Sequence, residues 1–351
     1  MPYRLRALHG SSLESFDLAV RQQEGHTDIP RLREGGISAQ FLAAYVPSSY
    51  EGRGAAPIAL EQIELIHRIA DLYPELELAR TAEDVRRIAG AGRIAILAAV
   101  EGGHALDNSL DVLQQFAELG VRYLTLTHSG TTDWADSATD AARHGGLTGF
   151  GVEVVREMNR LGMLVDISHV SDATMDHVLR VSRGPVIASH SGARAINDHP
   201  RNVPDDVLRR VAESGGLVMV VFFSGFVVPE AADVVRDMFD LERQLRARHG
   251  DDDAAIEREW RAHFASRPIP RGTVAHVVDH VDHIVRVAGV KHVGLGSDFD
   301  GTSKVPEGLD DVSGYPAITA ELVRRGYTDD QVLAILGGNV LRVLEDAEIG
   351  W

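Results

Sequence analysis

The chain has 351 residues, 44% hydrophobic and 25% charged, a composition typical of a globular enzyme with a large core. The net charge of −17 argues against a nucleic-acid partner, and the absence of cysteine from the sequence excludes disulfides, thiolate metal sites and a cysteine nucleophile. No apolar run is long enough to span a bilayer, and the first residues lack a signal-peptide core, so we expect a cytoplasmic location and no membrane partner.

Short apolar runs bounded by turn residues predict buried strands, with segments of helical periodicity between them. The strands are predicted at residues 37–46, 94–100, 123–127, 164–168, 186–189, 217–223 and 292–296. The helices are predicted at residues 55–72, 109–119, 148–161, 171–181, 204–213 and 273–288, with a charged helical insertion at 229–271. This alternation indicates a single α/β catalytic domain over residues 1–351, built as a (β/α)8 TIM barrel. Such a barrel needs eight strands, and only seven are predicted, so we expect the first strand to be missing.

Polar side chains come within two residues after the ends of five of the predicted strands: Glu101, His128, His169, His190 and Asp298. In a parallel barrel the carboxyl ends of all strands face one mouth, where the active sites of this fold lie. Carboxylates and imidazoles are common zinc ligands, so Glu101, His169 and His190 are predicted to bind a zinc-like ion. Each has a simpler alternative: the histidines could cap strands by hydrogen bonding, and Glu101 could cap a helix.

Three polar residues fit the chemistry of hydrolysis at such a site. Asp298 could hold a water molecule as a general base and then act as an acid, and His128 could donate a hydrogen bond to a developing oxyanion. Arg201 lies in the loop after the His190 strand, and its planar guanidinium suits a substrate carboxylate. The alternatives are a turn aspartate, a structural histidine and a solvated arginine.

Long motifs resemble the membrane (renal-type) dipeptidase family of metallopeptidases, and the resemblance covers residues 2 to about 343. The motifs are VEGGHALDNSLDV, YLTLTHSGTTDW, VDISHVSDATM, PVIASHSGARAINDHPRNVPDD and GLGSDFDG. The resemblance implies a barrel of the metal-dependent amidohydrolase type with a binuclear zinc site. It also implies hydrolysis of dipeptides, some with a C-terminal D-residue, by metal-bound hydroxide.

The resemblance assigns a role to each matching residue. Glu101 resembles the ligand that bridges the two zinc ions, and His169 and His190 resemble ligands of the second zinc. The remaining matches are His128, which resembles the residue that binds the tetrahedral intermediate, Arg201, which resembles the anchor of the substrate carboxylate, and Asp298, which resembles the catalytic aspartate.

One part of the family pattern has no counterpart. Family members carry an HxD motif on the first barrel strand, which supplies two ligands of the first zinc. The sequence from Met1 resembles the family segment located just after that motif, so we expect that Met1 is not the true start and that one zinc site is impaired. The segment from His26 to Asp28 also has HxD spacing. We reject it as a metal site, because the family has a similar sequence before its second strand that binds no metal.

Two other functions fit the same residues. The first is a catalytically impaired barrel that binds one metal ion or a small ligand. The second is another amidohydrolase, acting on cyclic amides or esters. The expected partner is a small dipeptide substrate, and a homodimer is one assembly state left open.

Overall fold

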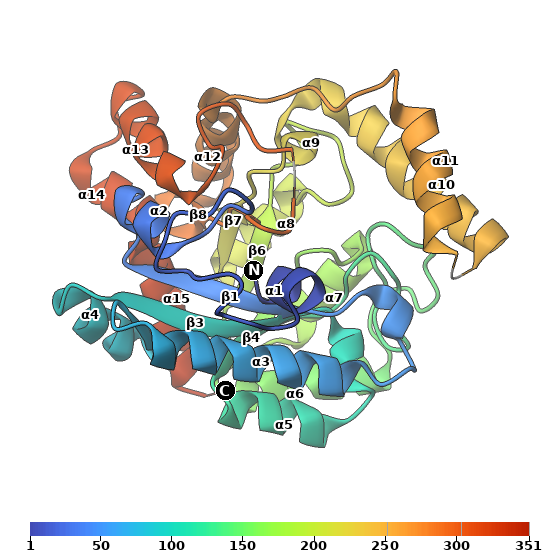
Figure 1. Cartoon of the computed structure of the whole chain (residues 1–351), viewed down its shortest axis with the longest axis horizontal. Helices are drawn as coiled ribbons and strands as arrows, with labels where there is room; N and C mark the ends of the chain where they lie inside the picture. The colour runs from blue at the N-terminus through green and yellow to red at the C-terminus, as the bar shows by residue number, and fades with distance from the viewer. Residues whose placement is uncertain (251, 303, 351) are drawn as a thin grey trace.

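The computed structural model describes residues 1–250, 252–302 and 304–350 (Figure 1). All seven predicted strands are present: β1 (Ala39–Tyr45), β3 (Ile94–Glu101), β4 (Val121–Thr125), β5 (Leu164–Asp166), β6 (Val186–Ser191), β7 (Leu217–Val220) and β8 (Val293–Leu295). A short strand that the sequence did not predict, β2 (Leu76–Leu78), pairs with the beginning of β3. No strand precedes β1 within the described residues.

The strands form one parallel sheet in the order β1-β3-β4-β5-β6-β7-β8, which curls as in a TIM barrel and confirms the predicted fold class (Figure 1). The sheet stays open between β1 and β8, which pair with each other nowhere in the described ranges. Gln62 covers the end of the free edge of β1. Its Nε2 donates to the carbonyl of Tyr45 (2.6 Å), and its Oε1 accepts the N–H of Tyr45 (3.2 Å). A side chain therefore takes the place of a neighbouring strand at this point.

Helices surround the sheet, and several begin at a side chain that caps them. Ser109, Thr148 and Ser171 precede helices after successive strands, and each side-chain oxygen accepts the N–H of the third helical residue, which stabilises a helix by about 1 kcal/mol. The helices are α1 (Pro2–His9), α2 (Ile29–Glu34), α3 (Ala55–Leu72), α4 (Ala82–Gly90), α5 (Leu110–Glu118), α6 (Gly149–Arg160), α7 (Asp172–Val181), α8 (Asp205–Glu213), α9 (Ser224–Val227), α10 (Ala232–His249), α11 (Asp253–Phe264), α12 (Val274–Ala288), α13 (Tyr315–Arg324), α14 (Asp329–Leu333) and α15 (Asn339–Glu348).

Both faces of the sheet are buried at β3, β5, β6 and β7, whereas β1 at the open edge is only partly buried, and alternate residues of each strand face opposite sides. In β3, Ala95, Leu97 and Ala99 pack in one hydrophobic cluster with residues of α4 and α15. Ile96 and Val100 pack on the other side in the larger cluster with the outer helices. This two-sided burial explains why the strands are continuous apolar runs. The alternation of side chains also places Glu101, the residue after Val100, on the same side of the sheet as Ala99, at the carboxyl end of the strand.

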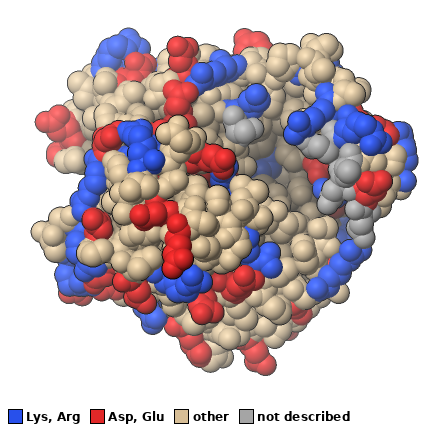
Figure 2. All heavy atoms as spheres, in the orientation of Figure 1, with Lys and Arg blue, Asp and Glu red and all other residues tan. Residues whose placement is uncertain are grey.

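The predicted charged insertion is helical and consists mainly of α10 and α11 (Figure 1). Arg243 of α10 donates to the carbonyl of Thr139 (2.5 Å), in the loop after β4. The ring of Phe239 on α10 lies 5.8 Å from that of His199, in the loop after β6. Figure 2 shows the surface hollowed beside these helices. The helices in the described ranges include none that is long and apolar enough to cross a membrane.

Candidate metal centre

The three predicted ligands converge at the carboxyl ends of β3, β5 and β6. The Nε2 atoms of His169 and His190 each lie 3.2 Å from Oε1 of Glu101 and 2.9 Å from each other. Ligands that bind a tetrahedral zinc ion at about 2.05 Å are about 3.3 Å apart, so these three atoms can share one ion. The side chains of Glu101, His169 and His190 are 15%, 10% and 9% exposed. The residues present therefore fit a divalent metal ion that is reached from the mouth.

Local backbone geometry brings the ligands into place. Glu101 is the last residue of β3, where Gly102 turns the chain with φ +101°. A Cβ atom at Gly102 would lie 2.4 Å from the ring of His104, so only glycine fits there. The His104 ring donates in turn to the carbonyl of Val46 after β1 (2.9 Å). His169 adopts φ +70°, a left-handed conformation that is uncommon outside glycine and typical of functional sites.

The protonation states suit metal binding. Burial lowers the pKa of His169 well below its ordinary value, so the ring is neutral. Burial opposes the charge of Glu101, but hydrogen bonds from His169 and His190 hold the pKa of this carboxyl well below its usual range. Burial would also lower the pKa of His190, but its hydrogen bond to Glu101 and the charge of Glu101 outweigh burial and raise it. A metal cation would replace that proton between imidazole and carboxylate.

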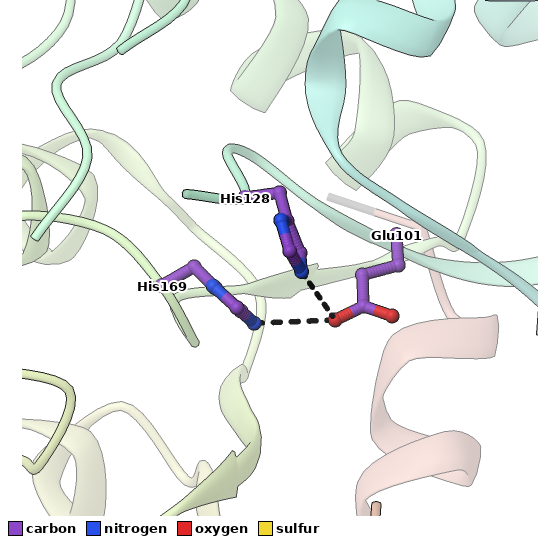
Figure 3. Close-up of side chains that lie close together, drawn as sticks. All are labelled: Glu101, His128 and His169. Atoms are coloured by element: carbon purple, nitrogen blue, oxygen red, sulfur yellow. Dashed lines mark ion pairs between the residues drawn. The ribbon is translucent and has the colours of Figure 1, made fainter. Parts of the chain in front are cut away.

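His128 lies beside these ligands, and Figure 3 shows its ring turned toward Glu101. Its Nε2 is 3.9 Å from Oε1 of Glu101, and its ring stacks on that of His169 with 4.3 Å between centroids. The ring of Tyr45 lies 4.6 Å away on β1. Burial lowers the pKa of His128 to about 4, so it is neutral and can donate one hydrogen bond. Glu101, His128 and His169 also form a group that could hold a metal ion, a ligand role that the sequence did not predict for His128.

Asp298 lies three residues after β8 and has φ +60°. Burial raises the pKa of its carboxyl to about 6, with His190 opposing the shift and the negative Glu101 adding to it. A carboxyl group with a pKa near neutrality can both accept and release a proton.

Arg201 is held behind the site rather than in solvent. Its Nη2 donates to the carbonyl of His190 (3.3 Å) and its Nη1 to Oγ of Ser191 (3.5 Å). Its guanidinium lies 5.1 Å from the ring centroid of Phe226, and the residue is only 1% exposed. The alternative of a solvated arginine is therefore wrong. Within the described ranges no ion pair joins Arg201 to a carboxylate, and its Nε has no hydrogen-bond partner.

The residues with HxD spacing before β1 are occupied elsewhere. Nδ1 of His26 accepts the N–H of Asp300 (2.9 Å). The carboxylate of Asp28 accepts the N–H of Gln22 (2.9 Å) and the Nε of Arg31 (2.6 Å). These side chains thus have structural hydrogen bonds, and the rejection of this segment as a metal site stays a prediction.

Sequence reasoning missed the polar residues directly beneath the ligands. Asp166 and Ser189 are buried, and the hydroxyl of Ser189 contacts the ring of His190. His199, also missed, accepts the N–H of Arg201 at its Nδ1 (3.2 Å). The sequence did contain a signal for Asp166 and Ser189, because each is a polar residue inside an otherwise apolar strand.

The chain has a parallel sheet of TIM-barrel type, with carboxylate and imidazole side chains at the carboxyl end of the sheet. These features are typical of metal-dependent α/β-barrel enzymes. Within this class the chain belongs to the membrane dipeptidase family (peptidase family M19), whose family model matches residues 1–349. Membership in this family of metallopeptidases implies a metal cofactor, for which Glu101, His128 and His169 offer a site.

Curated relatives and solved structures agree with this family. The chain is 40% identical to dipeptidase 3 of Rattus norvegicus over 353 residues, which cover 99% of this chain and 64% of that protein. It is 37% identical to dipeptidase verJ of Clonostachys rogersoniana over 362 residues, which cover 99% of this chain and 82% of that protein. The chain thus spans less than two thirds of the length of dipeptidase 3.

Two solved structures have the same fold. The probable dipeptidase PvdM from Pseudomonas aeruginosa matches with a TM-score of 0.82 and 27% identity, covering 95% of this chain and 91% of that chain. A metallo peptidase from Rhodobacter sphaeroides, liganded with a phosphinate mimic of the dipeptide L-Ala-D-Ala, matches with a TM-score of 0.80 and 26% identity. This match covers 100% of this chain and 97% of that chain.

Proposed function

We propose that the protein is a metal-dependent dipeptidase that hydrolyses dipeptides, including those with a C-terminal D-residue. The observation that carries the proposal is the convergence of Glu101, His169 and His190, whose ligand atoms lie within 3.2 Å of one another. The substrate class is drawn from the family and from the Rhodobacter sphaeroides relative with its L-Ala-D-Ala mimic. We place the activity in one catalytic domain that contains the 229–271 insertion.

In this proposal Glu101, His169 and His190 hold a zinc ion. When bound, such an ion polarises a carbonyl group and lowers the pKa of a water molecule. Asp298 takes a proton from the attacking water and returns it to the leaving amine, as a general base and then a general acid. His128 is neutral and donates to the oxyanion that develops on the substrate.

Arg201 is proposed to anchor the terminal carboxylate of the substrate. A buried guanidinium without a paired carboxylate is costly, and a substrate carboxylate would complete the pair. Nε of Arg201, which has no hydrogen-bond partner in the described part of the chain, supplies a further donor for that interaction. The fixed distance between this anchor and the metal centre would favour short peptides over long ones.

The test is hydrolysis by purified, zinc-loaded protein of matched L,L- and L,D-dipeptides, with tripeptides, lactams and lactones as controls. We expect turnover of dipeptides, its loss with a chelator and its return with zinc. Stoichiometric zinc without turnover of any dipeptide would contradict the proposal, and turnover of only the lactams or lactones would favour the cyclic-amide or ester alternative.

A further inference from the structure

A buried carboxylate lies beneath the candidate metal centre. Asp166 is fully buried at the end of β5, and its Oδ1 accepts the backbone N–H groups of Ser168 (3.0 Å) and Ser189 (2.8 Å). Its Oδ2 accepts the hydroxyl groups of Thr125 (2.5 Å) and Ser189 (2.6 Å). Four donors therefore surround this carboxylate, and it takes part in none of the ion pairs found among the described residues. Any effect of Asp166 on the metal centre must therefore pass through the residues that donate hydrogen bonds to it.

The hydroxyl of Ser189 connects Asp166 to His190. Oγ of Ser189 lies 2.7 Å from Nδ1 of His190 and 2.6 Å from Oδ2 of Asp166. A serine hydroxyl has one hydrogen, and an ionised carboxylate can only accept, so this hydrogen points to Asp166. The serine oxygen must then accept a hydrogen from Nδ1 of His190. The imidazole is thereby held with Nδ1 protonated, so that loss of the proton on Nε2 leaves a lone pair there for a metal ion beside Glu101.

The second imidazole lacks such a support. Nδ1 of His169 is buried and has no hydrogen-bond partner among the residues that the structure describes. The contrast within one centre shows that the contact of Ser189 with His190 is not a general consequence of burial at this depth.

We propose that Asp166 and Ser189 are positioning residues that fix the metal-binding tautomer of His190 and so set the affinity of the site for its metal ion. This inference rests on the metal centre of the proposed function. Partners behind a ligand histidine commonly change metal affinity by about 10–100-fold when they are removed. Here the carboxylate of Asp166 would act on His190 through the hydroxyl of Ser189.

The chain offers a discriminating set of variants. Ser189→Ala removes the connecting hydroxyl. Asp166→Asn should act differently. The backbone N–H groups of Ser168 and Ser189 need an acceptor, so the amide oxygen of the asparagine should take the position of Oδ1. Its NH2 group then faces the hydroxyl of Ser189. The serine hydrogen must then turn to Nδ1 of His190, and Nε2 becomes protonated. Thr125→Val is the matched control, since it removes another donor to the same oxygen of Asp166 without a link to His190.

Two measurements test the inference, neither of which depends on turnover. Zinc affinity is measured by competition with a chromophoric chelator, and the tautomer of His190 is read from its 15N shifts in metal-free protein at pH 8.5. We expect Ser189→Ala and Asp166→Asn to weaken zinc binding by ~10–100-fold. Asp166→Asn should also move the proton from Nδ1 to Nε2, and Thr125→Val should preserve both affinity and tautomer.

Unchanged zinc affinity and tautomer in both Ser189→Ala and Asp166→Asn would overturn the inference, and so would an equal loss of affinity in Thr125→Val. Because Ser189→Ala only removes one oxygen atom, it remains informative if Asp166→Asn does not fold. Dipeptide turnover by the unchanged protein tests the proposed function separately. A protein that binds zinc without hydrolysing dipeptides would refute that function and leave the role of Asp166 and Ser189 to be decided by these variants.

Discussion

His280 on α12 should make the fold sensitive to acid. Its Nδ1 accepts the N–H of Ala193 (2.8 Å), just after the strand of His190, and its Nε2 donates to the carbonyl of Val227 (3.2 Å). Both ring nitrogens are therefore used by the neutral form, and a proton on Nδ1 would face the N–H of Ala193. Burial lowers the pKa of His280 to about 4, compared with about 6.5 in the unfolded chain.

Proton linkage determines the sign and the magnitude of the effect. Below pH 6.5 the unfolded chain binds a proton at this residue, and the folded chain does so only near pH 4, so stability falls as the pH decreases through this window. Between pH 7 and pH 5 the loss from His280 is about 2 kcal/mol of the free energy of unfolding.

The perturbation is His280→Asn, which does not titrate and keeps an acceptor near the position of Nδ1. The free energy of unfolding is measured by urea denaturation at pH 7 and pH 5, with chelator present so that metal release adds no pH dependence. Other buried histidines titrate in both proteins and cancel in the comparison. We expect the variant to lose about 2 kcal/mol less than the unchanged protein between the two pH values. Equal losses would refute the assignment of a neutral, doubly bonded His280.

The remaining predictions concern the candidate site. Glu101→Gln keeps the shape but removes the charge that balances the cation, so metal content by mass spectrometry and activity should fall together, and retained metal would contradict this ligand role. Arg201→Met should raise KM for free dipeptides by ~10–100-fold but affect amide-blocked dipeptides little, while Asp298→Asn should lower kcat by ~10²-fold or more. Effects of both changes on KM alone would count against these roles. The chain of residues 1–351 should bind about one zinc ion, and two tightly bound ions would show that further ligands exist.

The fold could be predicted where burial leaves a strong pattern. β3 is apolar throughout because both faces of the sheet are covered, whereas β2 has only three residues and no apolar run. The prediction for β5 extended to residue 168, but the strand ends at Asp166, after which the chain turns toward the left-handed His169.

The approach of Glu101, His169 and His190 could be expected because parallel strands end at one side of a sheet. The stacking of His128 on His169 and the packing of Arg201 over the ring of Phe226 depend on how loops fold back over that end, which no spacing in the sequence specifies. The contacts between Asp166 and Ser189 depend on the register of neighbouring strands, and register is a property of the assembled sheet.

The left-handed backbone at His169 and Asp298 places function in conflict with stability. A side chain other than glycine in this conformation costs on the order of 1 kcal/mol or more at each position. Glycine would relieve that cost at both, yet it would remove an imidazole beside Glu101 and a carboxyl group whose pKa is about 6. Under the proposed function, selection for thermal stability alone would therefore favour a better-folded protein that has lost its activity through changes at these two positions. Screens that improve stability in this family should for that reason hold both residues fixed.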